Sequence, residues 1–239
     1  MRSSSRFPTT RRSAIVATRS GDPGERRAGW ETLIAAYWKP AYKYVRLRWN
    51  HDPACAEDLV QSFFAQVMEK EFFARYDPEK GSFRTWFRCC LDGYLSNARR
   101  AEAREKRGGL ARASLDIAEA EAELARQSAQ AVPSHDECFH REWQRHVFEM
   151  AVEDLRRHCE REGKLVPFEI FKRYDLSEDR SGYEQLAAEV GVPVAAVTNY
   201  LASMRRLLRR FVLARLREMT VDEREFHREA RFLLGGGAR

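Results

Sequence analysis

Seven large residues between positions 83 and 95 recur at alternating steps of three and one, which is the strongest pattern in the chain. They are Phe83, Trp86, Phe87, Cys90, Leu91, Tyr94 and Leu95. This spacing lines one face of an α-helix over several turns, whereas a strand would need alternation with a period of two. No segment shows that alternation clearly, and the 13 Gly and 8 Pro among 239 residues fall below the roughly 12% of average usage. The sequence therefore predicts an all-α fold.

Capping signals mark two helices before this one. Asp52 is a good N-cap and Pro53 suits the first helical position, so a helix is predicted from there to about Lys70. An earlier helix is expected from about Trp30 to Trp49, with a kink at Pro40 because proline lacks the backbone N–H.

Three further helical segments follow in the second half of the chain. Ser134 and Glu137 form a capping box, which predicts a helix that ends near Gly163. A short helix from Pro167 to Tyr174 and a longer helical unit from Tyr183 to about Arg217 are expected after it.

The chain length of 239 residues indicates two modest domains. The apolar pattern thins behind Gly108 and Gly109, which indicates a linker. We therefore expect two small helical domains joined by a flexible linker. The expected segments are a flexible basic arm at 1–29, a helical domain at 30–107, the linker at 108–134, a second helical domain at 135–217 and a charged, frayed tail at 218–239.

Composition indicates the net charge of the chain and the compartment in which it is expected. Lys and Arg number 42 against 36 Asp and Glu, so the formal net charge is +6. No run approaches the roughly 18 apolar residues of a membrane span, so we expect a soluble protein. Five cysteines, including the adjacent Cys89 and Cys90, favour a reducing cytoplasm over a disulfide framework. The basic, Ser-rich residues 1–21 favour a flexible arm, with a transit peptide as the weaker alternative.

Ala187, Gly191 and Val197 have the spacing of a helix-turn-helix. In that motif a small residue lets two helices approach, Gly makes the turn and a branched residue anchors the second helix. The second helix would start at Pro193 and present polar and basic residues to DNA. The candidate DNA-binding residues are Ala195, Ala196, Thr198, Asn199, Tyr200, Arg205, Arg206 and Arg209. An ordinary helical hairpin with a basic face is the alternative, because such spacing alone has many false positives.

The helix that begins at Phe83 mixes aromatic rings with cations. The arginines on or after it are Arg84, Arg88, Arg99, Arg100 and Arg104. An aromatic ring can stack on an unpaired base for about 1 to 3 kcal/mol, while Arg neutralises phosphates. An aromatic stripe at helical spacing more often forms core, and we expect most of these rings to do so.

Three motifs in order resemble the sigma-70 family of RNA polymerase sigma factors, and the compact two-domain form resembles the extracytoplasmic-function (ECF) type. The motifs are Ala56–Phe64, Tyr76–Trp86 and Tyr183–Pro193. The resemblance covers about residues 30–107 as region 2 and about 135–217 as region 4. It implies a cytoplasmic subunit that binds core RNA polymerase and directs promoter recognition, strand opening and transcription initiation. Strand opening would use binding energy alone, so no enzyme activity is implied.

The resemblance also assigns a polymerase-binding surface. In the family, the polar face of the second region 2 helix docks on the clamp helices of the largest polymerase subunit. The matching residues are Glu57, Asp58, Gln61 and Ser62. A plain solvated face is the alternative for these residues.

Two DNA contacts are implied in the same way. The loop from Tyr76 to Ser82 and the helix after it resemble the part that captures a base flipped from the non-template strand at the minus-ten element. The residues assigned to this capture are Tyr76, Lys80, Phe83, Arg84, Arg88, Asn97 and Arg100. The helix that starts at Pro193 would read the minus-thirty-five element in the major groove.

The implied partners are core polymerase, through its clamp helices and the flap of the second-largest subunit, and promoter DNA, with an anti-sigma factor as a further candidate. No cofactor or metal is implied. The linker acids resemble a segment that threads towards the polymerase active cleft, although a plain spacer fits them equally well. These acids are Asp116, Glu119, Glu121 and Glu123. The chain departs from the family at Gly93, where Asn is common, and at Thr198 and Tyr200, near which a basic residue is common.

Two other functions compete with this interpretation. A helix-turn-helix regulator that acts without polymerase would explain the second half of the chain but not the first. A metal or redox sensor is suggested by two groups of residues, but neither has a complete ligand set at a known spacing. These groups are His135, Cys138 and His140, and His51 with Cys55. No nucleophile–base pair, phosphate-binding Gly loop or paired-carboxylate site is present in the sequence, so no enzyme is predicted.

Overall fold

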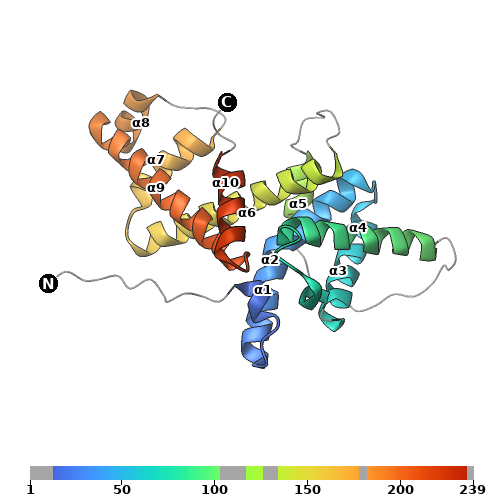
Figure 1. Ribbon diagram of the computed structural model, residues 1–239. Helices are drawn as coiled ribbons and strands as arrows, with labels where there is room; N and C mark the ends of the chain where they lie inside the picture. Colours follow the sequence, from blue (N-terminus) through green and yellow to red (C-terminus); the bar gives the residue numbers. More distant parts are fainter. Residues whose placement is uncertain (1–12, 71, 103–116, 126–133, 178–181, 236–239) are drawn as a thin grey trace. The chain divides into compact units, whose positions relative to one another are not determined.

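The computed structural model describes residues 13–70, 72–102, 117–125, 134–177 and 182–235. Every regular element within these ranges is helical, which confirms the predicted all-α fold (Figure 1). The long helices are α2 (Pro23–Arg48), α3 (Pro53–Glu69), α4 (Phe83–Glu102), α6 (His135–Arg161) and α9 (Val194–Glu218). The shorter helices are α1 (Ala14–Ala17), α5 (Ile117–Ala125), α7 (Leu165–Phe171), α8 (Tyr183–Val190) and α10 (Glu223–Gly235), with a 3₁₀ turn at Phe72–Arg75 and a π turn at Lys172–Leu176.

The chain divides into two compact units. Unit 1 comprises Met1–His146 with Leu216–Arg239, and unit 2 comprises Val147–Arg215. The divisions fall inside α6 and α9, so the units differ from the segments expected at 30–107 and 135–217. The first part of α6 groups with unit 1 because Phe139 and Trp143 are buried among the aromatic rings of that unit.

Within the described ranges no single helix is long and apolar enough to cross a membrane, and only α8 and α9 taken together, across a bend of 100°, reach the necessary length and composition.

Phe87 of α4 lies at the centre of the unit 1 core, where four helices meet. Its ring centroid is 4.6 Å from that of Tyr37 on α2, 5.4 Å from Phe63 on α3 and 5.9 Å from Phe139 on α6. All four rings are buried, and aromatic pairs at such separations stabilise a core beyond the area that they bury. The predicted stripe is confirmed as core: Phe83, Phe87, Leu91 and Leu95 are buried and Trp86, Cys90 and Tyr94 are partly buried.

The predicted capping signals act at the helix ends. The Asp52 carboxylate accepts a hydrogen bond from the backbone N–H of Cys55 at 3.0 Å, and α3 ends at Glu69. Ser134 and Glu137 form the predicted capping box, in which each backbone N–H donates to the other side chain, at 2.9 and 3.2 Å. Both helices therefore begin where the sequence predicts.

The flexible arm predicted at 1–29 is wrong for the part that the structure describes. The Asp22 carboxylate caps α2, so this helix begins at Pro23 rather than near residue 30. Helix α1 then packs on α2 at Gly29, where an added Cβ would lie 2.8 Å from a backbone oxygen of α1. This close approach of two backbones needs glycine. A contact between backbones produces no hydrophobic periodicity, so the sequence pattern did not indicate it. Residues 1–12 lie outside the described ranges.

The flexible linker predicted at 108–134 is also wrong for 117–125, which form helix α5; residues 108–116 and 126–133 lie outside the described ranges. The α5 carboxylates contact α2 in unit 1, rather than pointing away from the domain. Glu121 accepts hydrogen bonds from Tyr42 Oη and Arg46 Nε, both at 2.7 Å.

A second carboxylate of α5 is paired with buried lysines of α2. Glu123 forms ion pairs with Lys39 and Lys43, whose exposed fractions are 3% and 1%. Glu142 of α6 also lies 3.3 Å from the Lys43 ammonium. Buried ammonium groups need such partners, so these ion pairs, together with the buried Ala120, hold α5 against the rest of unit 1.

The predicted frayed tail at 218–239 contains helix α10. Asp222 caps it by accepting a hydrogen bond from the backbone N–H of Glu225 at 2.8 Å. Glu225, Phe226 and Glu229 are buried in unit 1. The expectation of fraying is wrong because two of its carboxylates, Glu225 and Glu229, are buried and contact Phe83 and Arg84 of α4.

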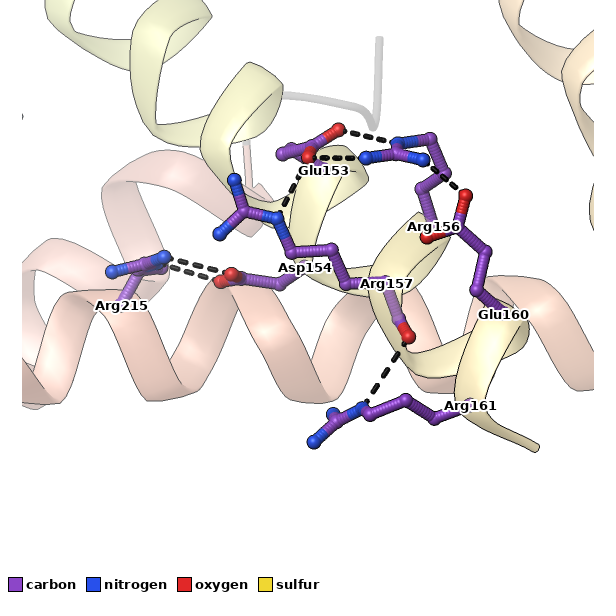
Figure 2. Close-up of polar contacts among 7 residues, drawn as sticks. All are labelled: Glu153, Asp154, Arg156, Arg157, Glu160, Arg161 and Arg215. Atoms are coloured by element: carbon purple, nitrogen blue, oxygen red, sulfur yellow. Dashed lines mark hydrogen bonds and ion pairs between the residues drawn. The ribbon is translucent and has the colours of Figure 1, made fainter.

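Unit 2 contains the end of α6, α7, α8 and most of α9 around an apolar core. Its buried residues include Leu155, Phe168, Ile170, Phe171, Leu186, Val197, Leu201, Met204 and Val212. Arg215 of α9 forms a two-pronged ion pair with Asp154 of α6, at 2.6 and 2.7 Å (Figure 2). Glu153, which precedes Asp154 on α6, pairs with Arg156 and Arg157 of the same helix. These hydrogen bonds lower the pKa of Glu153 to about 2.

Asp154→Asn should destabilise unit 2, because it removes the charge-assisted pair that joins α6 to α9. The loss should be about 1 kcal/mol for a partly buried pair, which corresponds to roughly five-fold faster amide exchange. Hydrogen–deuterium exchange over residues 147–161 and 194–215 measures it. Glu160→Gln is the matched control, since this exposed carboxylate pairs with Arg156 on its own helix. Equal protection in the two variants would show that the Asp154 pair does not hold unit 2 together.

Candidate nucleic-acid interface

Helices α8 and α9 in unit 2 meet at 100° across a three-residue connection. This angle lies within the range of helix-turn-helix pairs, about 90 to 120°. Gly191 adopts a left-handed conformation with φ of 73°, which a side chain rarely tolerates. Ala187 of α8 and Val197 of α9 are both buried in the core of unit 2. The structure thus places the small, turning and branched residues in the positions that their spacing predicts.

The residues proposed to read DNA lie along one exposed side of α9. Ala195, Thr198 and Asn199 are exposed, and Ala196 and Tyr200 are partly buried. Arg206 and Arg209 are also exposed, about two and three turns past Asn199 along the helix. Arg205 is exposed but forms a two-pronged pair with Asp175 at 2.7 and 2.8 Å. The group is therefore brought together, with one arginine already engaged inside unit 2.

The predicted polymerase-binding residues lie together on α3. Asp58 and Ser62 are exposed, Glu57 and Gln61 are partly buried, and the Gln61 side chain donates to Glu57 at 2.9 Å. The opposite face of α3 is buried in the core. These four residues therefore form a polar surface on a helix that the core of unit 1 fixes in place.

The seven residues assigned to base capture separate into two sets. Lys80, Asn97 and Arg100 are exposed, and Arg88 is partly buried and paired with Asp92 and Asp136. The other three, Tyr76, Phe83 and Arg84, are buried, with exposed fractions of 4%, 1% and 6%. Helix α10 covers the side chains of Tyr76 and Arg84, whereas the Phe83 ring packs in the aromatic core beside Tyr37 and Phe73.

Glu225 of α10 contacts two members of the buried set. One carboxylate oxygen accepts hydrogen bonds from the backbone N–H of Phe83 at 2.6 Å and from the Tyr76 hydroxyl at 2.8 Å. The other oxygen accepts from the backbone N–H of Val221 at 2.9 Å. Glu225 therefore links α10 to both the loop before α4 and the first turn of α4.

Arg84 is enclosed by α10 and α6. Its Nε lies 3.1 Å from a carboxylate oxygen of Glu229. The guanidinium lies 4.1 Å from the ring centroid of Phe232 and 5.0 Å from that of Trp143, so cation–π contacts add to the ion pair.

Burial changes the titration of the groups around this contact. It raises the pKa of Tyr76, and the Glu225 charge raises it further. Burial also raises the pKa of Glu225 despite the hydrogen bonds that it accepts. His140 of α6 packs edge-on against Phe232, and burial, aided by the Arg84 charge, lowers its pKa to about 4. The contact region is thus poorly hydrated, and its charges depend on one another.

Sequence reasoning missed the α10 residues. Glu225, Glu229 and Phe232 stand at steps of four and three, so they share one helix face. That spacing was the available signal, but the surrounding charges made the segment resemble a solvated tail.

Within the described ranges, no group of three or more His, Cys, Asp or Glu side chains is arranged to hold a metal ion. The five cysteines are free thiols. Burial raises the pKa of Cys90 to about 12 and that of Cys138 to about 11, so these two thiols are poor nucleophiles at neutral pH.

Residues 33–105 match the family model described as Sigma-70 region 2. No curated protein and no solved structure matches the chain. The matched segment runs from α2 through α3 to the end of α4, so it contains both the polar surface of α3 and the residues around Phe83. The match shows that this segment is similar to region 2 of the sigma-70 family of sigma factors.

Proposed function

We propose that the chain is a sigma factor of the ECF type that binds core RNA polymerase and directs recognition and opening of promoter DNA in the cytoplasm. The observation that carries the proposal is the Sigma-70 region 2 match over residues 33–105. Unit 1 would supply region 2, and unit 2 would supply region 4. A helix-turn-helix regulator that acts alone would not need the region 2 segment.

Polymerase would bind the polar surface of α3, formed by Glu57, Asp58, Gln61 and Ser62. The exposed Asp58 carboxylate gives this surface a negative charge, which basic residues on the clamp helices of the largest subunit would match. The surface stands on a helix whose other face is packed in the core. Its residues therefore hold their spacing before the partner arrives, which lowers the entropy lost on binding.

Promoter DNA would contact both units. The exposed side of α9 would lie in the major groove at the minus-thirty-five element, where Asn199 can form two hydrogen bonds with one base edge. Arg206 and Arg209 would hold phosphates. The α4 face with Asn97 and Arg100, together with the loop before α4, would hold the minus-ten strand. Two modest modules gain specificity when one polymerase carries both, because the second contact becomes intramolecular.

Asp58→Arg should prevent assembly with core polymerase, because it reverses a charge at the centre of the proposed surface. We expect at least about ten-fold weaker binding, since like charges across an interface cost several kcal/mol. Co-elution with core polymerase in size-exclusion chromatography measures it. Glu162→Arg makes the same charge change at an exposed position near the end of α6 and should assemble normally. Normal assembly of Asp58→Arg would remove α3 as the docking surface.

Asn199→Ala should leave assembly intact and weaken reading of one upstream base pair. Loss of a two-pronged base contact, which is worth about 1 to 3 kcal/mol, should reduce discrimination at that position by at least about five-fold. Selection of promoter fragments from a randomised library by the assembled holoenzyme measures it. Arg209→Ala is the contrasting variant, since loss of a phosphate contact weakens binding to all sequences alike. The same base preferences in Asn199→Ala and the unmodified protein would exclude Asn199 as a reading residue.

A further inference from the structure

Helix α10 buries an acidic and aromatic face on the part of unit 1 that would hold unpaired DNA. Glu225 and Glu229 are only 1% and 3% exposed, although carboxylates are rarely buried so completely. The helix has its own cap at Asp222 and a basic outer side that includes the exposed Arg224 and Arg228. Its buried acids therefore need an explanation other than helix formation.

The Glu225 carboxylate occupies donors that a nucleic acid would also use. It takes the Phe83 backbone N–H and the Tyr76 hydroxyl with a single oxygen. A phosphate oxygen or a base carbonyl is an acceptor of the same kind, and a backbone N–H at the start of a helix is suited to such acceptors. Glu225 and a flipped base or its phosphate would therefore compete for the same groups.

Glu229 and Phe232 act on Arg84 in a comparable way. The carboxylate pairs with the guanidinium as a phosphate would, and the ring stacks on its plane as a base would. Together the two side chains present an anion and an aromatic face from one helix. This combination is what single-stranded DNA offers to an arginine beside an aromatic pocket.

The contact is incomplete. Nη1 of Arg84 is buried with no hydrogen-bond partner in the described part of the chain, and its Nη2 reaches Glu229 only at 3.3 Å. An unsatisfied charged donor costs free energy in a buried site. A ligand with more acceptor oxygens would satisfy this guanidinium better than Glu229 does.

We propose that α10 is an autoinhibitory helix that occupies the minus-ten strand site of unit 1 and must leave before that site can hold single-stranded DNA. This inference rests on the proposed sigma function. It gives two states, covered by α10 or open to DNA, to the Tyr76 hydroxyl, the Phe83 backbone N–H and the Arg84 guanidinium. In the covered state the chain can still bind polymerase, because α3 presents its polar surface away from the core.

The test compares promoter opening by holoenzymes assembled with the unmodified full chain and with Glu229→Gln. The probe is a promoter selected by the unmodified holoenzyme, carrying 2-aminopurine in the minus-ten element as a reporter of strand opening. Glu229→Gln should speed opening by about ten-fold, because it weakens a charge-assisted contact that exists only in the covered state. It should also raise hydrogen exchange over 223–235 in the free protein. Arg231→Gln removes a charge from the exposed side of the same helix, where the side chain donates to the His227 carbonyl of that helix, and should change neither value.

Phe232→Ala is the second variant, because this side chain is 40% exposed and its loss should not disturb the unit 1 core. It should also speed opening, by a smaller factor than Glu229→Gln. Unchanged or slower opening by both variants, with assembly intact, would overturn the inference and make α10 a structural part of unit 1. Failure of the unmodified chain to bind core polymerase would instead refute the proposed function and, with it, this inference.

Discussion

The aromatic core around Phe87 is the constraint on which the rest of unit 1 depends. Its ring meets rings from α2, α3 and α6, so it sets how these helices pack on α4. The polar surface of α3 and the first turn of α4 are the outer sides of helices that this core holds. A rigid apolar interior thereby gives fixed positions to the residues for which we propose contacts with a polymerase and a DNA strand.

Charge has two different uses around that core. On α2, buried lysines are neutralised by carboxylates of α5, and this pairing fixes the short helix against α2. On α4, Arg84 is neutralised by α10 with incomplete hydrogen bonding. On α2, several carboxylates pair with the two lysine ammonium groups. On α4, Nη1 of Arg84 has no hydrogen-bond partner in the described part of the chain. This difference is why we assign a structural role to α5 and a regulatory role to α10.

The sequence predicted the long helices well, because periodicity and capping are local properties. The stripe from Phe83 to Leu95, the Asp52 cap and the capping box at Ser134 all appear in the structure. It did not predict α1, α5 or α10. Each of these depends on a partner distant in sequence: a backbone contact at Gly29, the lysines of α2 and Arg84 of α4. For the candidate site, the exposure of Asp58 and Asn199 followed from helical spacing, whereas the covering of Tyr76 and Arg84 did not.

The central proposal is that the two units act together on one polymerase and one promoter. Run-off transcription with purified chain, core RNA polymerase and a library of bacterial promoter fragments tests that claim most directly. The account predicts transcripts with defined start sites that appear only when the chain is added to the core enzyme. The absence of any chain-dependent transcript, together with the absence of a stable complex with the core enzyme, would contradict it.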